Sequence, residues 1–263
     1  MPNAYNPKEY ILPTNEPEAY RLNYQHKLLC EIFGGLYRAP LDESKALRVL
    51  DIGCGTANWA IEFAKQYPNA TVHGLDMNES KEWQVAPANC HLWVANLDSK
   101  ETRTALEDAF DYVHSRFITV GVKDWPTFLA RCLDEVTPGG WIELQELNCP
   151  AMCEVNVSDS ESSFLRFTTC LEEAFGKIGL SPRVSETFPQ LVAQAGFVGP
   201  KLESFNMILG PWPSDEWERR LGEKGLENWR MLARGLSRIA FTKVLGWSEE
   251  EHEFRSRGVG GDD

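Results

Sequence analysis

The segment Arg48-Val-Leu-Asp-Ile-Gly-Cys-Gly-Thr-Ala57 is the most informative part of this chain, because an apolar run ends in an acid and two glycines spaced G-x-G follow. A helical pattern comes next over residues 58–67, and a second apolar run over 70–75 ends in Asp76. Glycines let the backbone approach a ligand closely, and an acid at the end of the second strand can accept hydrogen bonds from both ribose hydroxyls. The pattern therefore predicts an α/β domain that holds a cofactor containing adenosine.

The details of the glycine turn distinguish between cofactor classes. A dinucleotide site uses G-x-G-x-x-G, so that a helix N-terminus faces the pyrophosphate, whereas the third residue after Gly55 is Asn58. Asp51, two residues before Gly53, would repel a diphosphate but suits the ammonium group of S-adenosylmethionine. We therefore predict S-adenosylmethionine as cofactor, with a nicotinamide or flavin dinucleotide and a degenerate site as alternatives. A lone G-x-G is by itself only a tight turn, and Asp76 argues against that simpler interpretation.

The charge of the chain restricts its partners. The net charge is −13, from 39 acidic and 26 basic residues, and no cluster of lysine and arginine interrupts it, so we expect no binding to nucleic acid. No run approaches the ~18 apolar residues of a membrane span, and residues 1–10 lack the apolar core of a signal peptide. We therefore expect no membrane association and a cytoplasmic or nuclear location.

The cysteines predict buried, reduced thiols, because their number is odd and they are scattered along the chain. Cys149 and Cys153, and the adjacent Cys90 and His91, are the candidate metal ligands. Neither pair has a convincing second pair, so we expect no metal site.

Strand and helix patterns alternate through the middle of the chain, which predicts a parallel sheet with helices on both faces. Strands are expected at 48–52, 71–75, 91–95, 111–113 and 141–147, and helices at 16–33, 58–67 and 125–136, with a turn at 137–140. After the fifth strand we expect helices at 160–176 and 186–195, a sixth strand at 201–209, and a long helix or helix pair at 214–245. These patterns divide the chain into an extended arm (1–15), a single domain with a helical insertion after strand five (16–247) and a disordered tail (248–263).

Several longer segments are more specific than the glycine turn. They are Tyr10-Ile-Leu-Pro13, Arg21-Leu-Asn-Tyr-Gln-His26, Phe110-Asp-Tyr-Val-His-Ser-Arg116, Asp124-Trp-Pro126 and Pro138-Gly-Gly-Trp-Ile-Glu-Leu-Gln-Glu146. With them the chain resembles the class I S-adenosylmethionine-dependent methyltransferases, and among these the fungal LaeA-like, or TAM-type, family, over residues 10–247. The resemblance implies a Rossmann-like sheet with helices on both faces, and an N-terminal helix over 16–34 that forms a lid on the cofactor.

The C-terminal sequence departs from that family. Relatives carry an aromatic-rich strand after the Gly246-Trp-Ser-Glu-Glu250 segment, whereas residues 252–263 of this chain have no strand character. We therefore expect the final antiparallel strand to be missing. The strand predicted at 201–209 would then be an exposed edge, through which a homodimer can form.

The resemblance also implies which residues contact the cofactor. Asp51, Gly53 and Gly55 would line its methionine end, and Asp76 would bind the ribose. Met77 would pack on the adenine face, and its alternative role is that of a surface turn residue.

Other implied contacts come from the third strand and from the lid helix. Asn96 and Leu97 would read the adenine edge, where Asn96 accepts through a neutral carbonyl and relatives usually carry an acid. Arg21, Gln25 and His26 lie within about one helical turn of each other. They would face the cleft, with Arg21 on the cofactor and Gln25 on the acceptor; a solvated helix face is the alternative.

The end of the fourth strand carries the candidate catalytic groups. His114 is the candidate general base, or alternatively a hydrogen-bonding contact of the cofactor, and Ser115 is expected beside the cofactor. Arg116 would bind a carboxylate of the acceptor or, the alternative that we favour, pair with Glu143 or Glu146. Glu146 is also a candidate contact of the acceptor.

The resemblance implies methyl transfer to an oxygen or nitrogen atom of a small molecule in fungal secondary metabolism. A base is needed only if the acceptor must lose a proton, and the cofactor supplies the activation. The alternative is a homologue that binds the cofactor but is regulatory or catalytically inactive and acts through protein partners.

Overall fold

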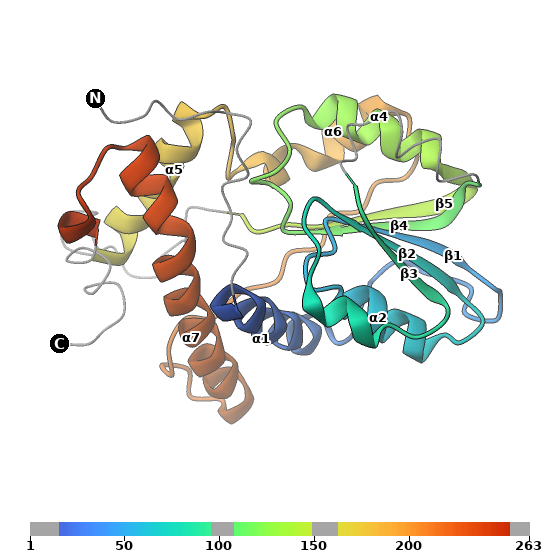
Figure 1. The fold of residues 1–263 in the computed structure, drawn as a ribbon, viewed down its shortest axis with the longest axis horizontal. Helices are drawn as coiled ribbons and strands as arrows, with labels where there is room; N and C mark the ends of the chain where they lie inside the picture. Colours follow the sequence, from blue (N-terminus) through green and yellow to red (C-terminus); the bar gives the residue numbers. More distant parts are fainter. Residues whose placement is uncertain (1–15, 96–107, 149–162, 253–263) are drawn as a thin grey trace.

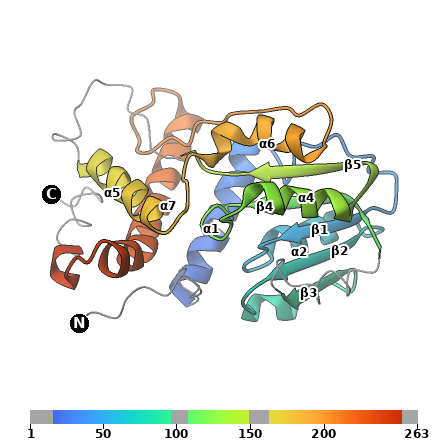
Figure 2. The same ribbon diagram turned by 90° about the horizontal axis from the view of Figure 1, so that it is seen from above.

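The computed structural model describes residues 16–95, 108–148 and 163–252, and it contains the predicted parallel sheet (Figure 1, Figure 2). The five strands are β1 Arg48–Ile52, β2 Thr71–Asp76, β3 Cys90–Val94, β4 Phe110–Arg116 and β5 Val136–Gln145. Their order is β3-β2-β1-β4-β5, and all of these pairs are parallel. The strand order reverses between β1 and β4, and ligands of open α/β sheets bind beyond the carboxyl ends of the strands at such a point.

The helices lie close to their predicted positions. They are α1 Glu16–Phe33, α2 Asn58–Gln66, α4 Trp125–Glu135, α5 Ser163–Lys177, α6 Phe188–Ala195 and α7 Glu216–Ile239, with short 3-10 segments η1 Lys81–Val85 and η2 Val184–Thr187 and a π-helical segment η3 Ala240–Val244. None of these helices is both long and apolar enough to cross a bilayer.

Local sequence signals explain where two of the helices begin or end. α4 starts after Asp124, whose carboxylate accepts from the amide of Thr127 at 3.0 Å, and Pro126 occupies the first turn, where a missing N–H costs nothing. α6 ends at Gly196, which takes the left-handed conformation with φ +109°.

Two apolar layers cover the faces of the sheet. On one face α2 packs over Val49, Val72 and Tyr112. On the other face α4 and α6 pack over Leu50 and Val113. The class of fold is therefore the one predicted from the alternation of strands and helices.

A third apolar cluster joins α5, α7 and η3 around Phe167, Trp229 and Phe241. These helices gather with α1 beyond one end of the strands (Figure 2). Val120, in the loop after β4, packs against this cluster. Helices α5 and α7 therefore lie next to the carboxyl ends of the strands.

The turn predicted at 137–140 lies inside β5 as an irregularity. Phe110 pairs with Val136 and Tyr112 pairs with Trp141, so β4 advances two residues where β5 advances five. Gly139, with φ +84°, supplies the bend.

The sixth strand predicted at 201–209 is wrong, because this segment has no strand structure, and β3 and β5 are the two edge strands of the described sheet. The segment packs elsewhere: the ring of Phe205 lies 5.0 Å from that of Phe33 on α1. Gly222 and Gly225 of α7 have no side chains, which lets the backbone at 208–210 approach that helix closely. A homodimer through the sheet edge stays a prediction, and its edge would now be β5.

The tail predicted to be disordered from residue 248 begins with an ordered turn, so that prediction is wrong for residues 248–252. Ser248 and Glu251 cap each other's amides, at 3.1 and 3.2 Å, which starts a short helix. His252 is buried, and its Nε2 lies 2.8 Å from the hydroxyl of Ser237 on α7. Residues 253–263 and the arm at 1–15 lie outside the described residues.

Candidate functional site

The polar side chains of the sheet form one row near the carboxyl ends of the strands. The strand register pairs Gly74 with Asp51, Asp51 with His114, and His114 with Glu143. The preceding row on the same face is apolar and consists of Val72, Val49, Tyr112 and Trp141. The side chains of Asp51, His114 and Glu143 therefore lie at the end of the sheet where α/β proteins bind ligands.

His114 is oriented by two contacts. Its Nδ1 lies 2.8 Å from Oδ1 of Asp51, and its ring stacks on the indole of Trp59, with 3.8 Å between centroids and 6° between planes. The side chain is 0% exposed, and Nε2 has no hydrogen-bond partner among the described residues. Because a carboxylate only accepts, Nδ1 carries the proton, and a neutral ring then keeps its lone pair on Nε2.

The glycine turn requires its glycines. Gly53 and Gly55 have φ of +71° and +55°, in the left-handed region that glycine adopts at little cost. A side chain at Gly53 would also collide with Ile118 from the loop after β4. The amide of Gly53 donates to the carbonyl of Leu75 at 2.8 Å, which ties the turn to the end of β2.

Asp76 lies beside this turn. One carboxylate oxygen accepts from the amide of Gly55 at 2.9 Å and the other accepts from the amide of Asn78 at 3.0 Å. Burial raises the pKa of Asp76, and these amides oppose the shift. A carboxylate has about four lone-pair sites, so both oxygens can accept further bonds from a ribose.

The other predicted cofactor contacts have different outcomes. Met77 is 49% exposed, so its side chain is open to a ligand or to water. Ser115 is buried, but it pairs with Ile52 and Leu144, which lie in the apolar layer under α4 and α6, so it is on the face opposite His114. The predicted contacts Asn96 and Leu97 lie outside the described residues.

The described residues fit the predicted cofactor. Gly53 and Gly55 carry no side chains of their own in the turn, and Asp76 retains acceptor sites for ribose hydroxyls. Asp51 keeps a second oxygen beside the one that binds His114. These residues would hold the methionine and ribose parts of S-adenosylmethionine.

The predicted lid helix α1 lies against the glycine turn. A methyl carbon of Leu22 is 3.5 Å from where a side chain of Gly55 would begin, and the side chains of Asn23 and Asn58 are hydrogen-bonded to each other. Arg21 is buried and binds Glu18 on its own helix through two nitrogens, at 2.7 and 2.8 Å.

Arg21 and Gln25 are thus both buried, and the solvated helix face that was their alternative is wrong. The Nη1 atom of Arg21 has no hydrogen-bond partner among the described residues, so this nitrogen is available to a ligand.

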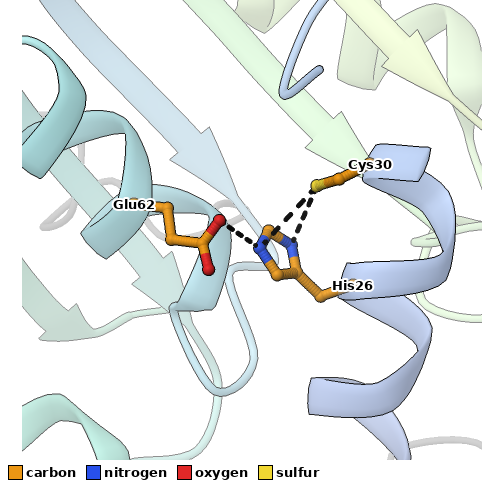
Figure 3. A group of neighbouring side chains, drawn as sticks. All are labelled: His26, Cys30 and Glu62. Atoms are coloured by element: carbon orange, nitrogen blue, oxygen red, sulfur yellow. Dashed lines mark hydrogen bonds and ion pairs between the residues drawn. The ribbon is translucent and has the colours of Figure 1, made fainter. Parts of the chain in front are cut away.

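A group of side chains that the sequence did not predict links α1, α2 and β4. Figure 3 shows its members from α1 and α2, which are His26, Cys30 and Glu62. Nε2 of His26 lies 3.0 Å from the carboxylate of Glu62, and Nδ1 lies 2.8 Å from Nη2 of Arg116. The thiol of Cys30 is 3.8 Å from Nε2 of His26. We call these four residues the polar hub. Because a guanidinium only donates, Nδ1 accepts and the proton is on Nε2.

The electrostatics of the polar hub agree with this proton placement. Burial and the charge of Arg116 lower the pKa of His26, so the ring is held neutral. Donor atoms of His26, Cys30 and Glu62 lie within 4.8 Å of one another, as metal ligands do. However, Arg116 already occupies the lone pair of Nδ1, and its charge would repel a divalent cation. The arrangement therefore suits a hydrogen-bonded link between helices better than a metal centre.

The ion pair expected between Arg116 and Glu143 or Glu146 is wrong for the described residues. Glu143 instead accepts from the amides of Arg38 and Ala39, at distances of 2.8 to 3.1 Å, and thereby holds the segment after α1 on the sheet. Nη1 of Arg116 has no hydrogen-bond partner among the described residues.

Glu146 holds the loop after β4 instead of facing a ligand. Its two oxygens accept from the amide of Ile118 at 2.8 Å and from the hydroxyl of Thr119 at 2.6 Å. Burial raises the pKa of Glu146 to about 7, and these hydrogen bonds oppose the shift.

Sequence reasoning missed two tryptophans that support the site. Trp59 stacks on His114, and the indole of Trp83 donates to the carbonyl of Gly55 at 2.9 Å. The only available signal was the position of Trp59 just after the glycine turn, and an aromatic there is equally typical of a core residue.

Comparisons with known proteins show the family of this chain. Residues 24–199 match the family model of a methyltransferase domain. The chain is 30% identical over 260 residues to methyltransferase pytC of Aspergillus terreus, which covers 98% of this chain and 78% of that protein. It is 31% identical over 252 residues to the protein-methionine methyltransferase laeA of Emericella nidulans, which covers 92% of this chain and 64% of that protein.

The fold is also similar to that of a solved structure, the complex between the Trm112 methyltransferase activator of Haloferax volcanii and a putative methyltransferase. The TM-score is 0.50 and the sequence identity 18%, and the match covers 82% of this chain and 93% of the other. The family match, the relatives and the parallel sheet with its glycine turn show that this chain belongs to the class I S-adenosylmethionine-dependent methyltransferases, with the fungal LaeA-like proteins among its relatives.

Proposed function

We propose that this methyltransferase transfers the methyl group to an oxygen or nitrogen atom of a small molecule in fungal secondary metabolism. The observation that carries the proposal is the state of His114. Its Nδ1 is fixed by Asp51 at 2.8 Å, and its Nε2 is a buried nitrogen without a hydrogen-bond partner among the described residues. A base oriented in this way is useful when the acceptor is a hydroxyl or an amine that must lose a proton.

His114 would take that proton on Nε2. The carboxylate of Asp51 keeps the ring in the tautomer with a free lone pair on Nε2, and it would stabilise the charged ring that forms. Trp59 restricts rotation of the ring by stacking on it. The bound cofactor supplies a methyl group activated by its sulfonium, and the residues of the chain supply orientation and an environment without water.

The cofactor would be held by the glycine turn and its neighbours. Asp76 would bind the ribose, and Asp51, Gly53 and Gly55 would line the methionine end. Support comes from the positive φ angles of the two glycines and from the free lone pairs of Asp76. Further contacts proposed for the cofactor are Arg21, Met77, Asn96 and Leu97, whereas Ser115 is left out because it lies on the opposite face of the sheet.

Arg116 and Gln25 are proposed to contact the acceptor. In support, the Nη1 atom of Arg116 is buried and has no hydrogen-bond partner among the described residues, and its guanidinium faces the neutral ring of His26. A buried donor without a partner costs free energy, and an anionic or carbonyl group of an acceptor would remove that cost.

A second candidate is a role that depends on protein partners. The relative from Emericella nidulans is named a protein-methionine methyltransferase. In addition, Nε2 of His114 is buried, and α1 lies against the glycine turn through Leu22. The lid must therefore move before an acceptor reaches this nitrogen. The name of this relative favours a protein that binds the cofactor and acts on, or through, another protein, whereas movement of the lid is compatible with both candidates.

One experiment distinguishes the two candidates. The purified chain is incubated with S-adenosylmethionine carrying a tritiated methyl group, together with either the small-molecule fraction or the protein fraction of an Aspergillus extract. Label in small molecules that is lost in His114→Asn supports the first candidate. Label in proteins supports the second, and binding of the cofactor with no label in either fraction supports an inactive, regulatory homologue.

A further inference from the structure

The loop that follows β4 has a strained start. Phe117 has φ +55°, a left-handed conformation that residues other than glycine seldom adopt. Its amide still donates to the carbonyl of Gln145 at 2.9 Å, and the amide of Gly121 donates to the carbonyl of Ile118 at 2.7 Å, which closes a tight turn. Strained backbone of this kind persists only where the surrounding structure holds it.

Glu146, just beyond the end of β5, holds this loop. One carboxylate oxygen accepts the amide of Ile118 at 2.8 Å, and the other accepts the hydroxyl of Thr119 at 2.6 Å. Hydrogen bonds to an ionised acceptor are about twice as strong as those between neutral groups. Two successive residues of the loop are therefore fixed by one side chain.

The loop connects the cofactor turn to the helical part of the molecule. Ile118 occupies the space that a side chain at Gly53 would fill, so it lies directly on the first glycine of the turn. Val120, two residues later, packs against the apolar cluster of α5 and α7. A displacement of the loop would therefore change both the contact of Ile118 with Gly53 and the packing of Val120 against the helical cluster.

We propose that Glu146 is a positioning residue for the cofactor: by fixing Ile118 and Thr119, it keeps Ile118 seated on Gly53 and so maintains the shape of the glycine turn. This role differs from the acceptor contact expected for Glu146 from the sequence. The proposal rests on the cofactor lying at the glycine turn.

The protonation state of Glu146 gives this role a measurable signature. Burial raises its pKa to about 7, while the bonds from Thr119 and Ile118 favour the ionised form. No charged side chain of the described residues contributes to this shift. The ionised carboxylate accepts from both donors with full charge, whereas the protonated group offers weaker acceptors. Affinity for the cofactor should therefore rise with pH through about 7.

Stability should show the opposite trend, which separates positioning from simple support of the fold. Because the folded pKa of Glu146 is above its ordinary value of 4.5, its contribution to stability falls as pH rises from about 4.5 to 7. A residue that only supported the fold would weaken cofactor binding and stability in parallel.

The test measures binding of S-adenosylhomocysteine by calorimetry from pH 5.5 to pH 8. Wild-type chain must bind, and a failure there would count against the cofactor site itself and not against Glu146. In Glu146→Gln we expect affinity roughly ten-fold weaker at pH 8, with the pH dependence through 7 removed. Glu172→Gln is the matched control, since it removes a partly exposed acid of α5 whose carboxylate lies 2.8 Å from the guanidinium of Arg183. This control should bind as wild type does.

A second variant covers the case in which Glu146→Gln does not fold. Thr119→Val removes the hydroxyl that favours the ionised carboxylate, so the midpoint of the pH dependence should move to higher pH. Wild-type affinity of folded Glu146→Gln across the pH range would overturn the proposal. An unchanged midpoint in Thr119→Val would also overturn it.

Discussion

The two faces of the central sheet share one backbone but carry different chemistry. On the face under α4 and α6, Leu50, Ile52 and Val113 are buried among apolar side chains. On the face toward α1 and α2, the next residues along the same strands, Asp51 and His114, form a buried polar pair. Because successive side chains of a strand alternate between faces, one residue of register separates the two environments.

The coverage of the faces explains the difference. α2 packs over the apolar row that includes Val49, Val72 and Tyr112, and the polar row beyond it lies toward α1. α1 reaches this end through the polar hub, in which His26 is bonded to Glu62 and Arg116. We therefore expect the face under α4 and α6 to contribute stability alone, and the face toward α1 and α2 to contribute both stability and the chemistry.

The largest effect that would test this division is the loss of turnover in His114→Asn. The asparagine amide can still donate to Asp51, so the buried acid keeps a partner, but no lone pair replaces Nε2 as a base. For a hydroxyl or amine acceptor, we expect kcat to fall by about 10²- to 10⁴-fold. Affinity for S-adenosylhomocysteine should change little. Unchanged kcat with a folded variant would remove His114 from the chemistry and leave it as a contact of the cofactor.

A change on the opposite face should reverse this pattern. Leu50 is fully buried in the centre of β1, so Leu50→Ala should lower the free energy of unfolding by about 2–5 kcal/mol. Turnover per folded molecule should stay close to that of wild type. Urea unfolding and activity measured on the same preparation check both parts, and a large loss of turnover at full occupancy of the folded state would contradict the division of roles.

A second histidine allows the two faces to be compared directly, because His73 on β2 has none of the hydrogen-bond partners of His114. Both of its ring nitrogens are buried without hydrogen-bond partners among the described residues, and burial lowers its pKa to about 4. The unfolded chain takes up this proton at its ordinary pKa of 6.5, so stability is lost as pH falls from about 6.5 to 4.

His73→Phe should remove that acid sensitivity. The loss of unfolding free energy between pH 8 and pH 5 should be smaller in the variant by about 2 kcal/mol. Urea unfolding at the two pH values measures the difference. Equal losses in His73→Phe and wild type would mean that the ring is solvated enough to take up a proton in the folded state.

The sequence was informative where the signals are local. The apolar runs at 48–52 and 71–75, and the helical spacing at 16–33, predict elements that the structure contains at nearly the same residues. The strand predicted at 201–209 was wrong, because the composition of a segment does not say which surface it packs against. There, glycines of α7 let the backbone pack against a helix.

The parts of the site that could not be predicted depend on contacts between distant segments. The bond between His26 and Arg116 joins residues 90 positions apart, and it exists only because α1 folds back over the sheet. Arg116 was expected to pair with Glu143, whose carboxylate is instead used by backbone amides at Arg38 and Ala39. Sequence patterns do not reveal such competition for one carboxylate.

The smallest expected effect concerns Ala57, where the polar end of the sheet meets α2. Ala57 has φ +60° and is fully buried, so its backbone is strained while its methyl group is packed. Ala57→Gly would relieve about 1 kcal/mol of strain but would lose about 0.8 kcal/mol of methyl burial and add freedom to the unfolded chain. We expect the free energy of unfolding to change by less than about 1 kcal/mol in urea. Gly53→Ala, which must displace Ile118, should be clearly more destabilising, and equal effects of the two variants would mean that contact with the loop does not fix the turn.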